Sequence, residues 1–514
     1  MIKFASVFLP IVLLSSHLAG QSQTGLLPYA DDIGNPAMKG SSNYDSTNQT
    51  YRLKGAGYNI WFDRDEFHYR YDSMSGDFIL TAHLGFLDEG VDPHRKIGWM
   101  VRASKDEQAA HISATLHGDG LTVLQWRALR GAYMRDPEDE LFSPKAHYNI
   151  VQLERRGDEF IMRAAHEGEP LQLIGAHQMP EMPDQVLAGL FLCSHNPDVV
   201  EEGMAWNVRM TRPVPQGYNA YSQGRYGSRI ELLDVETGKR KIIHESLHGI
   251  EAPNWNIDGK YLIVNMDGLL YRISIDGGQL EKIESGFADR INNDHGISPD
   301  GTTLAISHHR DGAPGGGSTI YTMPIEGGIP QQITEESPSY WHGWSPDGAH
   351  IVYVAERGEG TYHIYRANVA TEVEEQLTDY VGSHVDGPEY DPEGKYIYYN
   401  GTQSGTMQIW RMATDGTMPE QLTFDQYNDW FPHISPDGSN VVFISFEDDV
   451  EVTDHPFYQR VMLRMMPTSG GAPRVIAHLY GGQGTINVPS WSPDGRYVAF
   501  ISNPGITKKE ATDK

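Results

Sequence analysis

Histidines, acids and aromatic residues recur a few positions before six short turns in the C-terminal half of the chain. The turns are of the Ser-Pro-Asp-Gly type, and His295, His342 and His433 precede three of them. Asp386 and Glu389 precede a fourth. Three imidazoles with carboxylates between them are the ingredients of a site that binds a divalent metal ion or performs acid–base chemistry. These five residues are therefore the candidate catalytic groups.

Candidates for metal and ligand binding come from the same positions. His295, His342 and Asp386 are the metal candidates, because imidazole and carboxylate are common ligands of divalent ions. The sequence leaves the cofactor open, and a divalent metal ion is the one candidate. Such an ion could stabilise the anion formed when a proton leaves a sugar carbon. The candidates for ligand binding are Glu251, Asn254, Asn293, Asp294, Tyr340, Trp341, Trp430 and Asn487.

The offsets of the histidines argue against a single three-histidine site. His295 and His342 lie four residues before the proline of their turn, whereas His433 lies three before its own. Because side chains alternate along a strand, His433 is expected to point away from the other two unless a bulge intervenes. The competing interpretation is that these polar groups hydrogen-bond neighbouring strands or ordered water.

The turns lie between short strands that recur at a regular interval. After the turn at 391–394, the segments 395–399, 407–412 and 420–423 are each short and rich in strand formers. With the strand that enters the turn, each repeat has four strands. Four-stranded units at this spacing predict the blades of a β-propeller around a central channel. The inner strands would then bring the residues before each turn to one mouth of that channel.

The two ends of the repeat region complement each other. The last repeat supplies only an expected inner pair, 486–491 and 497–502, and the missing outer pair appears before the first full repeat as 228–234 and 239–244. Joining these segments would make a sixth blade and remove an exposed sheet edge. The sequence therefore predicts a closed six-bladed propeller over residues 226–503.

This region resembles the six-bladed propeller of the TolB family. The run Pro489-Ser490-Trp491-Ser492-Pro493-Asp494-Gly495 matches the repeat of that family throughout. The resemblance implies the fold, while propellers of this kind serve both as partner-binding proteins and as carbohydrate-active enzymes.

Residues 50–212 lack these turns and carry longer alternating strands, which favours a two-sheet sandwich. Runs such as 57–62 and 98–102 resemble the concanavalin A-like jelly-roll family, whose members often bind sugars on one sheet. Trp99, Trp126 and His68 are candidates for such contacts, although a tryptophan on an alternating strand is more often a core residue. Residues 21–49 form a preceding segment, 213–225 a linker and 504–514 a charged tail. The expected fold class is therefore all-β, a jelly-roll sandwich followed by a six-bladed propeller.

The composition and the N-terminal segment indicate the cellular location of the protein and limit the classes of partner that it could bind. The chain has 514 residues and a formal net charge of −29, so a nucleic acid is not an expected partner. Residues 1–20 read as a cleavable export signal, whose apolar run is too short to span a membrane, and no later segment could span one. Cys193 is the only cysteine, and none follows the apolar run, so no lipid anchor is expected. We expect a periplasmic or secreted protein.

Two polar loops are expected near the channel mouth, 307–317 and 447–456. The leading hypothesis is an exported recognition protein that binds a glycan or another small ligand through the mouth and the jelly-roll domain. One alternative is a polysaccharide lyase or glycoside hydrolase at the same mouth. Another is a TolB-like scaffold that binds a partner protein. Whether the protein is an enzyme stays open at this stage, although the absence of a Gly-x-Ser-x-Gly elbow excludes the propeller peptidases.

Overall fold

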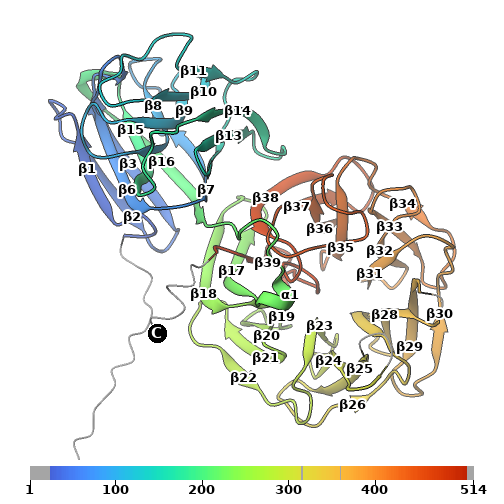
Figure 1. Ribbon diagram of the computed structural model, residues 1–514. Coiled ribbons are helices and arrows are strands. Elements are labelled where there is room, and N and C mark those ends of the chain that lie inside the picture. The colour runs from blue at the N-terminus through green and yellow to red at the C-terminus, as the bar shows by residue number, and fades with distance from the viewer. Residues whose placement is uncertain (1–23, 314–316, 359, 506–514) are drawn as a thin grey trace, which may run out of the picture.

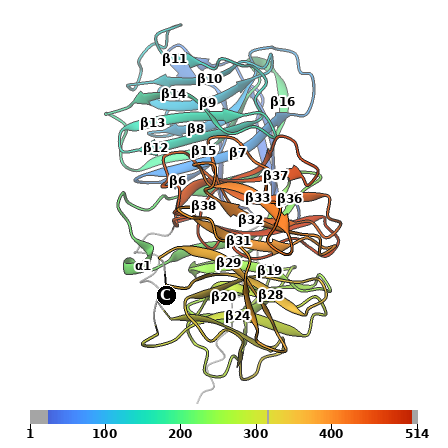
Figure 2. The ribbon, with the colours of Figure 1, turned by 90° about the vertical axis from the view of Figure 1, so that its right-hand side faces the viewer.

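The computed structural model describes residues 24–313, 317–358 and 360–505. The protein is built almost entirely of strands: a two-sheet sandwich comes first, and a ring of six small sheets follows (Figure 1). The sandwich lies against the rim of the ring (Figure 2). The expected signal peptide 1–20 and residues 506–514 of the expected tail lie outside the described residues. Within the described part of the chain, no helix is long and apolar enough to cross a membrane.

The sandwich consists of two antiparallel sheets of seven strands each. The first sheet has the order β1 (Tyr29–Ile33), β6 (Phe67–Met74), β15 (Val186–Cys193), β8 (Lys96–Arg102), β9 (His111–His117), β10 (Thr122–Arg127) and β11 (Glu140–Phe142). The second has the order β14 (Gln172–Gln178), β13 (Glu159–Ala165), β12 (Ile150–Arg156), β7 (Phe78–Phe86), β16 (Asn196–Thr211), β3 (Thr50–Gly57) and β2 (Ser41–Asp45). A short hairpin joins β4 (Ile60–Trp61) and β5 (Arg64–Asp65). The sheets therefore begin before residue 50, since β1 and β2 take part in them.

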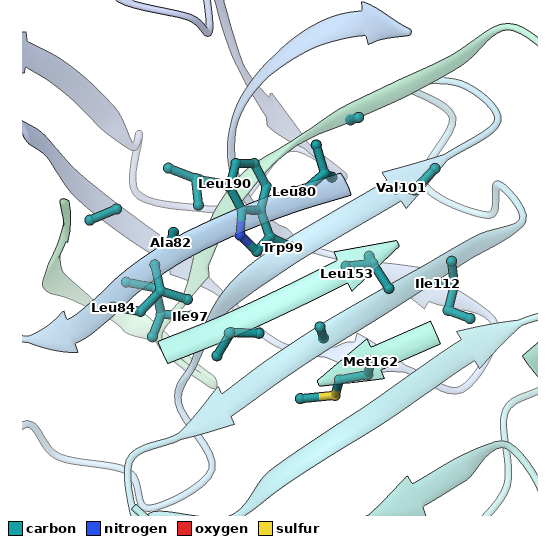
Figure 3. Close-up of a cluster of buried hydrophobic side chains, with 14 of the residues drawn as sticks. Leu80, Ala82, Leu84, Ile97, Trp99, Val101, Ile112, Leu153, Met162 and Leu190 are labelled. Atoms are coloured by element: carbon teal, nitrogen blue, oxygen red, sulfur yellow. The ribbon is translucent and has the colours of Figure 1, made fainter. Parts of the chain in front are cut away.

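Alternating apolar residues form the core between these two sheets. Leu80, Ala82 and Leu84 point from β7 into the same cluster as Trp99 of β8 (Figure 3). Trp126 belongs to this cluster and is 5% exposed, while Trp99 is 0% exposed. His68 is also buried, and its ring contacts Asp32 and Ser42. None of the three sandwich candidates for sugar contacts is thus presented to solvent, because their side chains are used in packing and internal hydrogen bonds.

Five complete blades of four antiparallel strands follow in chain order. Blade one is β19 (Ile250–Trp255), β20 (Tyr261–Met266), β21 (Leu269–Ser274) and β22 (Glu281–Ile283); blade two is β23 (Ile291–Ile297), β24 (Thr303–His309), β25 (Ser318–Pro324) and β26 (Gln331–Gln332). Blade three is β27 (Ser339–Trp344), β28 (His350–Glu356), β29 (Tyr362–Asn368) and β30 (Glu374–Gln376). Blade four is β31 (Val385–Tyr390), β32 (Tyr396–Gly401), β33 (Gln408–Ala413) and β34 (Glu420–Gln421); blade five is β35 (Asn428–Ile434), β36 (Asn440–Phe446), β37 (Gln459–Pro467) and β38 (Arg474–Gly481).

The sixth blade joins both ends of the repeat region, as the sequence predicts. It contains β39 (Tyr497–Ser502), β17 (Tyr226–Asp234) and β18 (Arg240–His248), and β17 pairs with β39 over six residues. The prediction of an inner strand at 486–491 is wrong, because Trp491 alone forms a β-bridge in this segment, to Val498. The carbonyl groups of Ile486 and Pro489 instead accept hydrogen bonds from side chains of other blades, so this segment does not form a regular ladder.

Hydrogen bonds and an ion pair connect the sandwich to the propeller at their boundary. The side chain of Gln49 exchanges two hydrogen bonds with the backbone of Ile242 in β18. Arg209 of β16 forms an ion pair with Glu231 of β17. The chain then crosses to the propeller through residues 212–225, where the short helix α1 (Ala220–Gln223) lies on one face of the ring (Figure 2). The interface and the crossing segment together hold the sandwich beside blade six.

Candidate functional site

A cavity of about 740 Å³ lies at the end of the propeller where the inner strands begin. We call it the mouth cavity. Blades one to five contribute to its wall, together with the segment between β38 and β39 and with residues 220–225 in and after α1. Its lining includes the predicted residues Glu251, Asn293, Asp294, Tyr340, His342, Asp386 and Asn487. The structure thus brings together seven of the candidate residues, which come from blades one to four and from the segment before β39.

Bulges in the inner strands decide which side chains reach this cavity. The ladder between β27 and β28 skips one residue, His342, which lies between the paired residues Trp341 and Gly343. In β23 the irregular stretch comes earlier, between Ile291 and His295, so His295 is back in the ladder opposite Ile306. A bulge re-aims the side chain it contains. The two histidines share the same offset from their turns, yet only His342 lines the cavity.

Asp294, His342 and Asp386 form a charged group at the inner wall of the cavity. Nε2 of His342 lies 3.0 Å from Oδ1 of Asp386. Asp294 accepts a hydrogen bond of 2.8 Å from the amide of Asn292 on its own strand. All three side chains are largely buried, although they line the cavity. The three groups therefore influence each other through a medium that screens charge poorly.

Burial and neighbouring charges shift the pKa values of Asp294, His342 and Asp386 by different amounts and in different directions. Burial raises the pKa of Asp294 to about 7, and the nearby charge of Asp386 adds to the rise while His342 opposes it. Burial also acts to raise the pKa of Asp386, but the hydrogen bond and charge of His342 outweigh it and lower the value to about 2. Burial acts to lower the pKa of His342, and the two carboxylates outweigh it, so the net shift is upward. The His342–Asp386 pair is thus an ion pair beside a carboxyl group that titrates near neutrality.

We expect the substitution Asp386→Asn to lower the pKa of His342. The variant loses the hydrogen bond and charge that chiefly raise this pKa, while burial continues to favour the neutral imidazole. Titration of the histidine ring signals by NMR measures the change. Asp267→Asn, beside the exposed His248, is the matched control and should leave His342 unchanged. An unaltered pKa in Asp386→Asn would contradict the assigned pair.

A second polar cluster connects the crossing segment to the first two blades. Arg225 forms an ion pair with Glu251, and the other carboxylate oxygen of Glu251 accepts from the amide of Asn293 at 2.9 Å. Tyr221 of α1 lies at the cavity wall and is 79% exposed. The charge of Glu251 is therefore already balanced by Arg225, in contrast to that of Asp294.

The other candidates lie outside the cavity wall. His295 is buried beneath it, with a weak contact to the carbonyl of Ile263. His433 is hydrogen-bonded to Glu389 at 2.6 Å and to the carbonyl of Ile486. These groups satisfy one another and tie blades four, five and six together. Such contacts between blades are the alternative role that the sequence left open for them.

The remaining candidates are structural as well. Asn254 bridges the carbonyl of Pro489 and the backbone N–H of Ile297. Trp341 and Trp430 are 1% and 0% exposed and belong to apolar clusters within the propeller. Their predicted role in ligand binding, which would be to stack on the ligand, does not agree with this burial, because their large apolar area is used in packing.

The structure separates the three residues that the sequence predicts as metal ligands. His342 and Asp386 are adjacent at the cavity wall, whereas His295 does not line it. Across the described ranges 24–313, 317–358 and 360–505, no group of three or more histidine, cysteine or acidic side chains is placed to hold a metal ion.

The cavity is also lined by residues that counting back from the six turns does not identify. They are Tyr221, Arg225, Tyr362, His384 and Phe431. Phe431 has φ of +55°, which marks the bulge in β35, and its ring stacks on His342 with centroids 6.0 Å apart. The two expected loop segments do contribute, through His309, which is the last residue of β24, and through His455. A signal for the bulges was present in the sequence, since proline follows the bulged residue in β19, β31 and β35 and cannot donate to a ladder.

A six-bladed propeller closed by both ends of its repeat region, with a polar cavity at one mouth, defines the structural class of the C-terminal part. The family model of the TolB beta propeller domain matches residues 217–384 and 343–508. The chain therefore belongs to the TolB beta propeller family.

Individual relatives agree with this assignment. An uncharacterized protein of Agrobacterium fabrum is 46% identical over 279 residues, which cover 54% of this chain and 93% of that protein. A solved structure of a TolB-like protein from Agrobacterium tumefaciens has 44% identity and a TM-score of 0.52, and the match covers 55% of this chain and 100% of that one. The Tol-Pal system protein TolB of Francisella tularensis is 27% identical over 285 residues, covering 52% of this chain. The match spans 61% of the length of that TolB.

Proposed function

We propose that this protein is an exported recognition scaffold of the TolB type, whose mouth cavity binds a segment of a partner protein. The observation that carries the proposal is the mouth cavity itself, because five blades of a TolB-family propeller and the segment that leads to β39 contribute side chains to it. Its mixture of aromatic, amide and charged groups suits a polypeptide segment, which offers apolar and polar contacts together. The relationship to a Tol-Pal system protein supports a protein as the partner.

The proposal includes a periplasmic or secreted location. It rests on the export signal expected at residues 1–20 and on the relationship to Tol-Pal system proteins. We further propose that the two-sheet sandwich is a jelly roll of the concanavalin A-like kind. Its bonded contact with blade six would fix it beside the propeller, so that both parts present one rigid surface to the partner.

Glycan recognition is the competing function. It would use Tyr340, which lines the cavity, to stack on a sugar, but Trp341 and Trp430, the other two aromatic candidates for ligand binding, are buried. An acid–base enzyme would have to rely on His342 and Asp386, since Glu389 and His433 lie away from the cavity wall. Protein recognition needs no such platform or catalytic pair, and we therefore favour it.

Site-specific cross-linking tests the proposal in the organism that produces the protein. A photoreactive phenylalanine analogue replaces Tyr221 at the cavity, or Ile329, which is equally exposed at 79% and does not line the cavity. We expect illumination to produce a discrete protein adduct from position 221 and none from position 329. Equal labelling at both positions, or none at either, would contradict a protein-binding mouth. Saturable binding of the purified protein to a defined glycan, without an adduct, would favour the competing function instead.

A further inference from the structure

The carboxylate of Asp294 differs from the other buried acids of the mouth cavity in lacking a cationic partner. Glu251 is paired with Arg225, and Asp386 is paired with His342. Asp294 is 6% exposed and accepts one side-chain hydrogen bond, from the neutral amide of Asn292. Within the described part of the chain, no ion pair reaches it. A carboxylate can accept about four hydrogen bonds, so this one retains acceptor capacity at the cavity wall.

Aromatic rings surround the same part of the cavity. Tyr340 and Tyr362 line it with ring centroids 6.1 Å apart, and Phe431 lies on the side of His342. The charges of Asp294 and Asp386 both act on Tyr340, which places the carboxylates and the rings close together. Aromatic faces attract cations, and the attraction is stronger where water is excluded. Rings and a free carboxylate together favour a compact cation with an apolar stem.

We propose that the mouth cavity holds a primary ammonium group of the partner, a lysine side chain or an amino terminus, against Asp294 and among the rings of Tyr340, Tyr362 and Phe431. This inference rests on the proposed function, for which it names the chemistry of the bound segment. It also agrees with the formal net charge of −29, which attracts basic partners.

Charge balance explains why the bound group should be a single cation. With His342 protonated, the group of Asp294, His342 and Asp386 has no net charge when Asp294 carries a proton and one negative charge when it does not. An ammonium group restores neutrality by taking the place of that proton. Because the pKa of Asp294 is about 7, binding at pH 7 should release roughly half a proton for each amine bound.

The titratable groups whose charges act on Asp294, or on which its charge acts, are Tyr221 of α1, Tyr340 and His342 of β27, and Asp386 of β31. Tyr362 of β29 lies beside Tyr340, and the wall of the same cavity also holds Arg225, Glu251, Asp289, Arg290, His309, His384 and His455. The three tyrosines have raised pKa values, with burial as the main cause, and stay neutral at pH 7. At a saturating amine concentration, a proton released from His342 would still be counted per amine bound in the variant Asp294→Asn, whereas a proton released from Asp294 would not, so this variant separates the two sources.

The test uses small probes of matched shape on the full chain. Nα-acetyl-lysine amide offers only the side-chain amine, glycine amide offers only the α-amine, and Nα-acetyl-norleucine amide keeps the stem but lacks the charge. We expect at least one amine to bind saturably by calorimetry and the norleucine probe to bind at least tenfold more weakly, because a hydrogen bond to a charged group contributes about 1.5–3 kcal/mol. The amine that binds more tightly shows whether the bound group of the partner is a lysine side chain or an amino terminus. A pH electrode in unbuffered solution measures the number of protons released.

Two variants with the same change of charge decide the outcome. Asp294→Asn should weaken binding of the amine about tenfold or more and abolish most of the proton release, whereas Asp289→Asn, at the exposed rim of the same cavity, should do neither. Equal binding of the lysine and norleucine probes, or equal behaviour of the two variants, would overturn the inference. Thermal melting of both variants confirms folding.

The cross-linking experiment separates this inference from the proposed function. If the adduct at position 221 forms in the native protein while neither amine probe binds, the amine inference fails and protein recognition stands. If no adduct forms and an amine still binds through Asp294, the cavity is an amine site that does not serve a protein partner.

Discussion

The substitution Glu231→Gln is expected to destabilise the protein by about 3–5 kcal/mol, because it removes the carboxylate that lies between two buried arginines. Arg209 comes from the sandwich and Arg240 from β18, and both donate to Glu231 at the boundary of the two parts. The hydroxyl of Ser502 in β39 also donates to it. One side chain thus joins the sandwich, the first propeller strands and the last one. Urea unfolding at pH 7 measures the loss.

The effect should depend on pH in a defined direction. The charges of Arg209 and Arg240 outweigh burial and hold the pKa of Glu231 far below its ordinary value. The stabilisation is therefore fully present above the pKa of about 4.3 in the unfolded chain and decreases as the pH falls below it. The difference between native protein and variant should shrink under acid conditions.

A matched control is available on the neighbouring strand. Glu245 pairs with Arg229, but its side chain is 54% exposed, so Glu245→Gln should cost less than about 1 kcal/mol. If the two variants lose the same stability, or if the Glu231→Gln difference does not change with pH, the boundary ion cluster does not have the role assigned to it.

Much of the propeller could be predicted because its signals are local and repeated. Proline and glycine in the turns restrict the backbone directly, and the apolar segments between them alternate as strands do. The complementary ends also identified the shared sixth blade, which the pairing of β17 with β39 shows. In the segment 486–491, Ile486, Val488 and Trp491 favour a strand, but Pro489 cannot donate to a ladder. Gly482 and Gly484 adopt φ of +126° and +86°, and these conformations turn the backbone away from a ladder.

The mouth could be located from the sequence, but its lining could not be derived by counting. Glu251, Asp294 and Asp386 reach the cavity as expected from the convergence of inner strands. His295 does not, because the bulge in β23 ends before it, whereas the bulge in β27 contains His342. Counting assumes a regular period of two, and one extra residue reverses the direction of every later side chain. Residues from other segments, such as Arg225, carry no periodic signal that links them to the site.

Closure of the ring by its last strand should be as important to stability as the boundary ion cluster. Phe500 of β39 is 0% exposed and packs in one cluster with Leu233 of β17 and Ile444 of blade five. Phe500→Ala leaves a cavity where the first and last strands of the propeller meet, so we expect the free energy of unfolding, measured with urea, to fall by about 3–5 kcal/mol. Tyr497→Ala on the same strand should cost clearly less, because Tyr497 is partly exposed. A small effect of Phe500→Ala would mean that the backbone pairing of β39 with β17 closes the ring without help from side-chain packing.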